Sequence, residues 1–452
     1  MKNYIVVLLA LLSLLYPTFA QKKEKPNGEI AKMLKGVSAK RIETDIRKLV
    51  SFGTRNTNSE QDNPTRGIGA SRDWIFAEFQ KISADCGNCL TVEKQTYLQE
   101  AMPPPRGRVP EAINITNIFA VLKGTTDPNR VYVVSGHYDS MCSNPADAKC
   151  DAPGANDDAS GTAAVIEMAR VMSKRKFDAS IIFMAVAGEE QGLLGARHFA
   201  EQAAAKKMDI EAMFTNDIIG GVTTFKNAAN RNTVRVFSEG VPSNETEQDG
   251  ATRRSVGGEN DSASRQLARF IKETADLYSP KFRVMMIYRR DRYGRGGDHI
   301  PFLEKGFTAV RFTETNEDYD HQHQNVRTEN GKFYGDTPEY VDFEYVTNVA
   351  RVNAASLARL ALAPARPKNV IIVNRLGNDT ELKWDAGTDA DLAGYEIVWR
   401  DTTSPVWTNS VSGGNVTNFV MKGMSKDNYF FGVRAVDKDG NKSPVSFPKP
   451  VR

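Results

Sequence analysis

Apolar and polar positions repeat with two different periods between residues 114 and 362. Short apolar runs of strand type alternate there with longer stretches of helical period. Strands that alternate with helices favour a mostly parallel sheet sandwiched by helices, so the expected fold class is α/β. The predicted strands lie at 118–122, 131–135, 180–186, 212–219, 282–288 and 308–312, and the predicted helices at 158–172, 193–205, 263–277 and 341–362.

The flanking segments have other patterns. Amphipathic helices are predicted at 30–50 and 70–82, within an N-terminal segment, 21–110, that packs on or precedes the main domain at 111–363. The sequence leaves open whether this segment includes a removable pro-segment. Residues 220–261 are rich in Asn, Gly, Ser and Glu, which indicates a loop or insertion.

A run of prolines and alanine at 364–367 ends the last helix, and only strand-like runs follow. We expect a small all-β sandwich at 368–452, with Trp384 and Tyr429 in its core. The spacing of the runs resembles a fibronectin type III domain. This segment has no cluster of titratable residues, so we expect a stabilising or interaction module that could bind a protein or surface partner. Its predicted strands lie at 369–373, 381–384, 394–399, 418–421 and 429–436.

The N-terminus has the pattern of a cleavable signal peptide, residues 1–20. Lys2 precedes an apolar run from Ile5 to Leu15, and Thr18-Phe19-Ala20 is a suitable cleavage site. The run is too short to span a bilayer, and no second run follows. We therefore expect a secreted or periplasmic protein without a membrane span.

Export affects the interpretation of the four cysteines. An even number in an oxidising compartment favours disulfides, and spacing favours the local pairs Cys86–Cys89 and Cys142–Cys150. A redox motif or half of a zinc site is the alternative for the first pair. Lys and Arg total 59 and Asp and Glu 56, and this balance gives no reason to expect nucleic acid as a partner.

Candidate metal ligands stand where predicted strands end. His137 and Asp139 follow the strand 131–135, and a carboxylate at 139 could reach the far ring nitrogen of His137. Asp157 and Asp158 precede a helix, where Asp158 is a candidate N-cap and Asp157 a candidate bridging ligand. Nitrogen and oxygen ligands of this kind suit zinc.

Two adjacent glutamates, Glu189 and Glu190, end the buried strand 180–186. Burying both would be costly unless they are paired or metal-bound. Because adjacent side chains point in different directions, Glu190 is the candidate ligand and Glu189 the candidate general acid/base. Asp217 ends the next strand, and Asp320-His321-Gln322-His323-Gln324 offers two further histidines.

Three ordered motifs make residues 110–363 similar to the co-catalytic zinc exopeptidase family of bacterial leucyl aminopeptidases, which also includes glutamate carboxypeptidases and glutaminyl cyclases. The motifs are Gly-His-x-Asp at 136–139, Pro-Gly-Ala-x-Asp-Asp-Ala-Ser-Gly at 153–161 and Gly-Glu-Glu-x-Gly-Leu-Leu-Gly at 188–195. The resemblance implies two zinc ions per chain. It assigns His137 and Asp217 to one, Glu190 and His323 to the other, Asp157 to both, Glu189 as base and Asp139 as the residue that orients His137.

The resemblance is imperfect near the last ligand. Gln324 and Arg327 stand where the family often has Thr and an acid, so His321 remains an alternative to His323. Asn156 replaces a frequent Asp at a position that is not a ligand. Residues 296–302 resemble a supporting segment of the family. Four arginines precede them and either form a solvated loop or receive substrate carboxylates: Arg289, Arg290, Arg292 and Arg295.

The expected function is therefore that of a metallo-exopeptidase, most simply an aminopeptidase acting on peptides. A single-zinc glutaminyl cyclase and a carboxypeptidase are the alternatives within the family. An inactive adhesion or binding relative is the alternative from another class, but such a protein usually lacks ligands or the base, and this sequence has them all.

Overall fold

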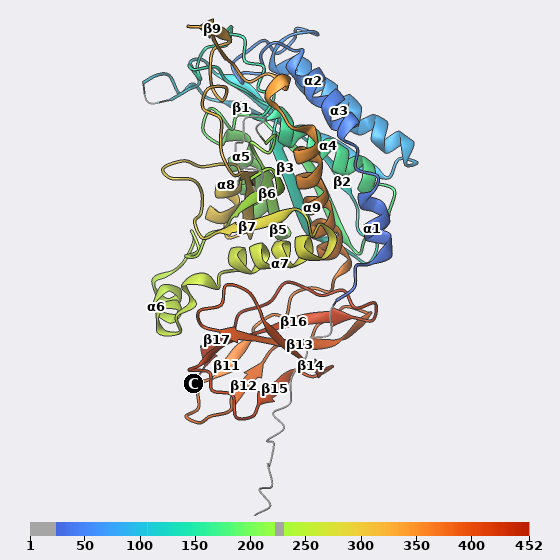
Figure 1. Ribbon diagram of the computed structural model, residues 1–452, viewed down its shortest axis with the longest axis vertical. Helices are drawn as coiled ribbons and strands as arrows, with labels where there is room; N and C mark the ends of the chain where they lie inside the picture. The colour runs from blue at the N-terminus through green and yellow to red at the C-terminus, as the bar shows by residue number, and fades with distance from the viewer. Residues whose placement is uncertain (1–23, 106, 222–229, 452) are drawn as a thin grey trace, which may run out of the picture.

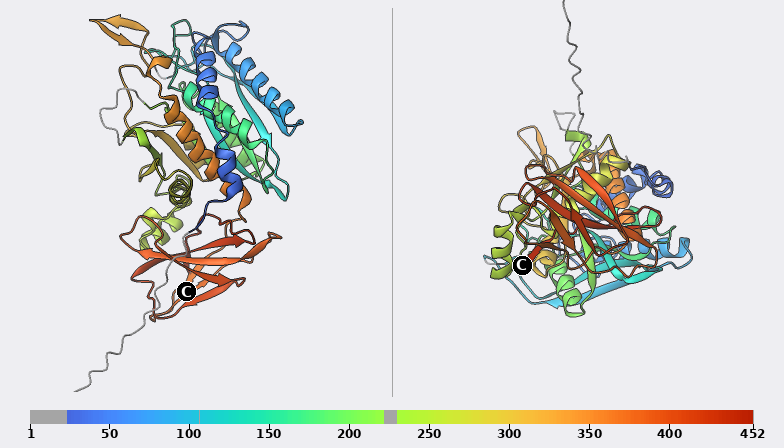
Figure 2. Two further views of the ribbon diagram at one scale, coloured as in Figure 1. Left: turned by 45° about the vertical axis from the view of Figure 1, so that its right-hand side comes forward. Right: turned by 90° about the horizontal axis from the view of Figure 1, so that it is seen from below.

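A computed structural model describes residues 24–105, 107–221 and 230–451. The predicted signal peptide lies outside the described residues. The chain forms an α/β part built on one large sheet and, at one end of it, a small β-sandwich (Figures 1 and 2). The predicted fold class is confirmed. Among the described residues, no helix is long and apolar enough to cross a membrane.

The large sheet has eight strands. Its four central strands, β4, β3, β5 and β8, are mutually parallel, β6 and β7 are parallel to each other, and the other neighbours are antiparallel. In spatial order the strands are β1 (Leu90–Gln99), β2 (Ile113–Leu122), β4 (Ala179–Val186), β3 (Asp127–His137), β5 (Asp209–Asn216), β8 (Ala309–Glu314), β6 (Thr233–Phe237) and β7 (Arg283–Ile287).

Helices cover both faces of this sheet (Figure 1). The larger core lies between one face of the sheet and a larger group of helices. A second core lies between the other face and a smaller group of helices. The larger group consists of α1 (Gly28–Leu34), α2 (Ala39–Val50), α3 (Gly67–Asp85), α4 (Ala159–Met172), α7 (Ala263–Tyr278) and α9 (Phe343–Leu362), and the smaller of α5 (Leu194–Ala205) and α8 (His299–Glu304).

Three sequence predictions need correction. The helix predicted at 30–50 is two helices, because the chain turns at Gly36 and Ser38 caps α2 by accepting a hydrogen bond from Arg41 N. The segment 220–261 is not only a loop, since it contains β6 and helix α6 (Glu247–Ser255). Strand β1 and the hairpin β9 (Arg327–Glu329) and β10 (Lys332–Tyr334) were not predicted, because their side chains are mostly half-buried or exposed and show no apolar run.

The C-terminal part is a sandwich of two sheets, as predicted, and Trp384 and Tyr395 pack edge to face in its core. Tyr429, the other predicted core aromatic, is half-buried at its margin. The sheets are β15 (Asn418–Met421), β12 (Thr380–Lys383), β11 (Ile371–Val373) and β17 (Lys449–Val451), and β14 (Asn409–Gly414), β13 (Leu392–Asp401) and β16 (Tyr429–Asp437).

Both predicted disulfides are present. Cys86 is bonded to Cys89 at the end of α3, and Cys142 is bonded to Cys150 in the long loop between β3 and α4. Neither pair is free to bind a metal, although Asp147 lies close to the second. The second disulfide ties down the loop that leads from His137 to Asp157.

Candidate metal centre

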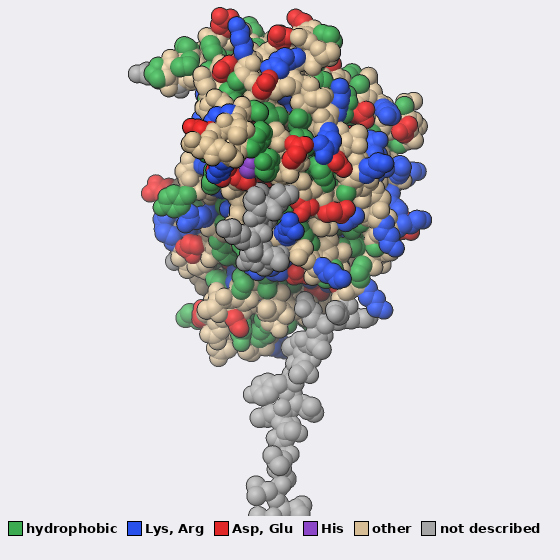
Figure 3. All heavy atoms as spheres, turned by 45° about the horizontal axis from the view of Figure 1, so that its top comes forward, with side chains coloured by type: hydrophobic (Ala, Val, Ile, Leu, Met, Phe, Trp, Pro, Cys, Tyr) green, Lys and Arg blue, Asp and Glu red, His purple; other side chains and the backbone are tan. Residues whose placement is uncertain are grey.

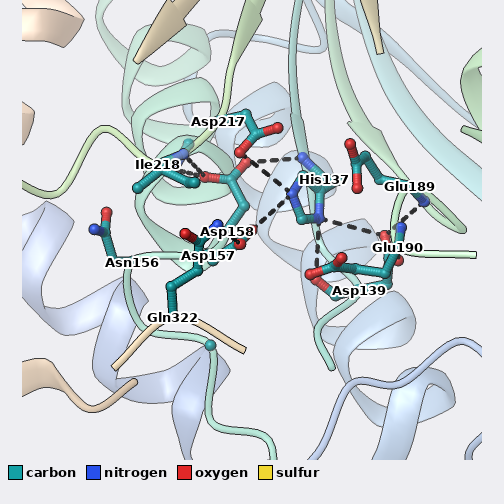
Figure 4. A network of polar contacts seen from close by, with 12 residues as sticks. His137, Asp139, Asn156, Asp157, Asp158, Glu189, Glu190, Asp217, Ile218 and Gln322 are labelled. Atoms are coloured by element: carbon teal, nitrogen blue, oxygen red, sulfur yellow. Dashed lines mark hydrogen bonds and ion pairs between the residues drawn. The ribbon is translucent and has the colours of Figure 1, made fainter. Parts of the chain in front are cut away.

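The candidate ligands gather at the carboxyl ends of the central parallel strands, where open α/β sheets place their ligand sites. His137 is the last residue of β3, and Asp217 follows the last residue of β5. Glu190 lies in the turn after β4, and Asp157 in the loop that leads into α4. His323 reaches the same place from the long loop after β8. The fold thus brings together all five predicted ligands (Figure 4 shows four of them).

These five residues form two groups that share Asp157. In the first group, Nε2 of His137 lies 3.1 Å from Asp157 Oδ1 and 3.8 Å from Asp217 Oδ1. In the second, Nε2 of His323 lies 2.8 Å from Asp157 Oδ2 and 3.0 Å from Glu190 Oε1. The two oxygens of Asp157 therefore face different histidines, which is the arrangement of a carboxylate that bridges two cations.

The donor atoms fit metal ions better than they fit one another. Nε2 of His137, Oε1 of Glu190 and Nε2 of His323 are buried and form no hydrogen bond. Buried polar atoms without partners are costly, so their convergence on two points indicates a bound group. Nitrogen and carboxylate donors of this kind suit zinc, and each group supplies three, which leaves a position open for water or substrate.

The site carries an excess of negative charge. Burial lowers the pKa of His137, but the surrounding carboxylates outweigh burial and raise this pKa well above its ordinary value. Burial likewise opposes the charged form of His323, yet Glu190 and Asp157 raise its pKa to about 11. The negative field that raises the pKa of both histidines also attracts other cations. Two divalent ions would neutralise it.

Asp139 and Asp158 form hydrogen bonds that position His137 and the turn with Glu189 and Glu190. The nearest partner of His137 Nδ1 is the carbonyl oxygen of Asp139, at 3.1 Å, and the Asp139 carboxylate follows at 3.5 Å. That carboxylate also accepts hydrogen bonds from the amides of Glu189 and Glu190, at 3.3 and 3.1 Å. Asp139 therefore contacts His137 mainly through its main chain, and its side chain fixes the glutamate turn. Asp158 is the N-cap of α4 and also accepts a hydrogen bond from His137 N.

Three supporting residues were not found from the sequence. Arg311 on β8 is fully buried, and its Nη1 lies 2.8 Å from Asp217 Oδ2, so the other oxygen of Asp217 is left to face His137. Asp336 accepts hydrogen bonds from the amide of Asp157 at 2.7 Å, and Gln322 donates to Asp157 Oδ2 at 2.8 Å. No local motif marks these residues, because each acts across a long sequence separation.

Glu189 belongs to neither ligand group but lies beside them in the cleft (Figure 4). Burial raises the pKa of Glu189 well above its ordinary value, and the negative charges of Asp217 and Glu190 raise it further. Glu189 is half-buried and lines the cleft, where it can reach water or a substrate.

His321 lies apart from both ligand groups. Its ring stacks on Tyr340 with a centroid distance of 3.6 Å, and its Nδ1 lies 2.8 Å from Asp318 Oδ2. His299, in the segment predicted to be supporting structure, is fully buried against the carbonyl oxygen of Arg290. Burial lowers the pKa of His299 to about 4.

The arginines of the 289–295 loop differ from one another. Arg292 is nearly buried and pairs with Asp291 and Glu317, and Arg295 also pairs with Glu317. Both arginines line the cleft, but each already forms an ion pair with Glu317. Arg289 lies over the ring of Tyr293, and Arg290 donates a hydrogen bond to Ser243, so these two belong to the outer surface.

Four of the five candidate ligands line a cleft of about 1080 Å³, and the fifth, His137, is buried beneath them. In the space-filling view a histidine is visible beside acidic side chains, with basic and hydrophobic side chains around it (Figure 3). The cleft is large enough for a short peptide. One part of its wall is apolar and consists of Met102, Met141, Leu193 and Leu194.

Comparisons with known proteins agree with this geometry. Residues 117–335 match the model of peptidase family M28. A probable zinc metalloprotease of Leptosphaeria maculans is 46% identical over 94% of this chain and 98% of its own length. Another, from Pyrenophora tritici-repentis, is 45% identical over 94% of this chain and 88% of its own length.

Among solved structures, the LapA aminopeptidase of Legionella pneumophila has a similar fold. Its TM-score is 0.51 at 20% identity, over 80% of each chain. This likeness concerns the fold alone, whereas the fungal relatives match almost the whole sequence. The chain therefore belongs to peptidase family M28, and its curated relatives there are described as probable zinc metalloproteases.

Proposed function

We propose that this protein is a secreted zinc-dependent aminopeptidase that binds two zinc ions and uses Glu189 as its general base. The observation that carries the proposal is the position of Asp157, which presents one carboxylate oxygen to the buried His137 and the other to the half-buried His323. A site for one ion would not need a carboxylate shared between two sets of donors.

The ligand roles follow from the two groups. His137 and Asp217 would hold one zinc ion, Glu190 and His323 the other, and Asp157 both. Arg311 keeps Asp217 from turning away, and Asp139 positions His137 together with the glutamate turn. Two such ions would polarise a substrate carbonyl and lower the pKa of a bound water molecule.

Glu189 carries the proton transfer. It accepts the proton of the attacking water and then delivers it to the amine that leaves when the peptide bond breaks. Burial and neighbouring charge raise its pKa, and a raised pKa suits a group that must both accept and return a proton near neutral pH. The adjacent Glu190 cannot do the same while its carboxylate serves as a ligand.

The charged side chains of the cleft bear on which end of a peptide it takes. Four carboxylates line the cleft, those of Asp157, Glu189, Glu190 and Asp217, and with three of them serving as zinc ligands Glu189 is the one left to contact the α-amine of a peptide. Four arginines line the cleft, and each already has an acceptor, which makes them poor receptors for a terminal carboxylate. Arg292 and Arg295 pair with Glu317, Arg197 pairs with Glu304, and Arg108 donates to the carbonyl oxygen of Glu190. This arrangement favours an aminopeptidase over a carboxypeptidase.

Secretion is supported by two features. The first 20 residues have the pattern of a signal peptide, and all four cysteines form disulfides, which persist in oxidising compartments.

A substrate panel tests the proposed activity. Purified protein is assayed with aminoacyl p-nitroanilides, with N-acetylated peptides that have a free carboxyl terminus, and with peptides that begin with glutamine. We expect release from the free-amine substrates only, its loss with a chelator and its return with zinc. Cleavage of the acetylated peptides would show a carboxypeptidase, and ammonia release from N-terminal glutamine a cyclase. Either result without aminopeptidase activity contradicts the proposal.

A further inference from the structure

Arg55 is a fully buried arginine outside the segment that matches the family model. It lies between α2 and α3, more than 80 residues before the first candidate ligand. Its guanidinium donates hydrogen bonds to four main-chain carbonyl oxygens, those of Leu49, Tyr138, Pro153 and Gly154. An arginine so placed organises the backbone around it.

Three of these four carbonyl groups lie beside candidate ligands. Tyr138 follows His137, and its oxygen is 2.7 Å from Arg55 Nε. Pro153 and Gly154 precede Asp157, and their oxygens are 2.5 and 2.9 Å from Nη1 and Nη2. A single planar group therefore sets the distance between the strand end that presents His137 and the loop that presents Asp157.

The loop is built around this side chain. Gly154 has φ +52°, and a Cβ added there would lie 2.4 Å from the carbonyl oxygen of Asp157 and 2.9 Å from Arg55 Nη2. Glycine thus permits a backbone conformation and a close approach that other residues would not. The space that a side chain at 154 would need is taken up by the Asp157 carbonyl oxygen, Ser140 Cβ and Arg55.

The residues around Arg55 make further contacts with the same loops. Arg55 N donates to Ser140 Oγ, and Ser140 N donates back to the Arg55 carbonyl oxygen. Thr57 donates to Asp139 Oδ2 at 3.3 Å, and Ala152 N donates to the carbonyl oxygen of Gly53. The segment 53–57 therefore lies against the metal-site loops along its length.

The charge of Arg55 also bears on the site. No carboxylate of the described residues lies within ion-pair distance of its guanidinium, so the buried charge has no direct partner there. Burial lowers the pKa of Arg55 to about 10, while the acids of the metal site, Asp336, Asp139, Asp158 and Asp157, favour its charged form. A buried, unpaired cation is costly, and its place below a cluster of acids compensates for that cost.

We propose that Arg55 is a positioning residue for the bridging carboxylate of Asp157, and that residues 53–57 are part of the metal-binding unit. The inference rests on the proposed two-zinc site. It also answers a question that the sequence leaves open: no segment that includes residues 53–57 can be removed as a pro-segment from the active enzyme.

Zinc affinity of variants tests the role of Arg55. Arg55→Met removes the charge and the four hydrogen bonds at similar length, and Arg55→Lys keeps the charge but cannot span the same carbonyl groups. Affinity is measured by competition with a chromophoric chelator, well below the melting temperature. We expect Arg55→Met to bind at least one zinc ion tenfold more weakly, and Arg55→Lys to lie between it and the wild type.

Arg130→Met is the matched control, because Arg130 is equally buried but lies near the opposite end of β3. It should lower the melting temperature and leave zinc affinity unchanged. Wild-type affinity in a folded Arg55→Met would overturn the inference, as would wild-type affinity in Arg55→Lys if the Met variant does not fold. A wild-type protein that binds fewer than two zinc ions would instead overturn the proposed function.

The natural protein offers a second test that needs no substitution. The amino terminus of the secreted, active form is determined by mass spectrometry of the intact protein. We expect it to lie before residue 53. An active form that begins after residue 57 would overturn the inference.

Discussion

Glu189 lies among the metal-site acids and yet faces the cleft, so its replacement tests the chemistry without removing a ligand. Glu189→Gln keeps the shape of the side chain but cannot accept a proton. We expect kcat to fall by roughly 10²- to 10⁴-fold, the range typical of a lost general base. Zinc content, measured in parallel by mass spectrometry, should stay at the wild-type level.

Glu201→Gln serves as the control, because Glu201 is an exposed residue of α5 that contacts Lys305 on the surface. It should leave kcat unchanged. A Glu189→Gln variant with wild-type kcat would show that another group takes the proton.

Asp45 on α2 gives a residue-scale prediction about pH. Its side chain is buried, and its Oδ2 has no hydrogen-bond partner. Burial, helped by Glu78 and Glu167 and opposed by Arg41 and Arg170, raises its pKa from 3.8 to about 7. The folded state therefore holds this proton more tightly than the unfolded state does. Below about pH 4 both states are protonated; between pH 4 and 7 the stability of the fold falls as pH rises, and above pH 7 the loss is complete.

Asp45→Asn removes this pH dependence. The free energy of unfolding of the variant minus that of the wild type should rise by roughly 1–3 kcal/mol from pH 5 to pH 8. The measurement is the difference in free energy of unfolding, or in melting temperature, between the two proteins at each pH. An equal difference at pH 5 and pH 8 would contradict the prediction.

Residues of the site differ in how visible they are in the sequence. Adjacent acids after a buried strand, as at Glu189 and Glu190, are conspicuous, because burial without a partner would be costly. Arg55 and Arg311 are not conspicuous, since an arginine in a polar segment or an apolar strand gives no sign of what it contacts. Their roles come from contacts across 80 residues or more, which only the fold creates.

At the scale of elements, β3 and α4 are packed so closely that their contact admits no side chain. A Cβ on Gly136 of β3 would lie 2.4 Å from the Gly161 carbonyl carbon and 2.5 Å from Thr162 N on α4. These are backbone atoms and cannot move aside. We expect Gly136→Ala to destabilise the fold by roughly 1–3 kcal/mol, as overpacking does, and to weaken zinc binding, because the end of β3 carries His137.

Thermal unfolding and zinc competition measure the two effects. Gly28→Ala is the control, because Gly28 opens α1 and an added Cβ would meet nothing within 4 Å. It should be neutral or slightly stabilising. Unchanged stability of Gly136→Ala would mean that the two elements can separate without cost.

Strong periodicity predicted the central elements well, and its absence explains the errors. Strand β4 is buried along its whole length and reads as a nearly continuous apolar run, and β3 contains a buried apolar run at 131–134. Strand β6 is short and stands in a polar segment, so it was assigned to a loop. The break between α1 and α2 was missed because the apolar positions continue across it, and only Gly36 and Ser38 mark the turn.

At the scale of the whole molecule, the sandwich packs against the α/β part through an interface that contains buried polar contacts. Arg400 of β13 reaches Asp261 at 2.7 and 2.9 Å, and Arg269 of α7 shares that carboxylate. Trp407 donates a hydrogen bond to Gln266 of α7 at 3.0 Å. The two parts lie together in all views (Figures 1 and 2), so they should unfold as one unit.

Substitution of Arg400 tests whether the sandwich and the α/β part unfold together. Arg400→Met leaves Asp261 paired with Arg269 alone and should cost roughly 1.5–3 kcal/mol, the range for losing hydrogen bonds to a charged group. Differential scanning calorimetry should show one transition for the wild type, and an earlier or split transition for the variant. Lys449→Ala, which removes an exposed pair with Asp249, should change neither. Two separate transitions in the wild type would contradict the account.

The sequence predicted a sandwich but not its attachment. Arg400 and Asp261 look like ordinary surface charges in the sequence, and only the packed structure shows that both are buried. The sandwich packs on the α/β part, and its binding of another protein or a surface stays a prediction.

The number of zinc ions per chain tests the central claim most directly. Protein stripped with a chelator is titrated with zinc, and bound metal is counted by mass spectrometry for the wild type and for His137→Ala and His323→Ala. The two groups that share Asp157 predict two ions in the wild type and weakened binding at a different single site in each variant. One ion or none in the wild type, or loss of the same site in both variants, would contradict the two-metal account.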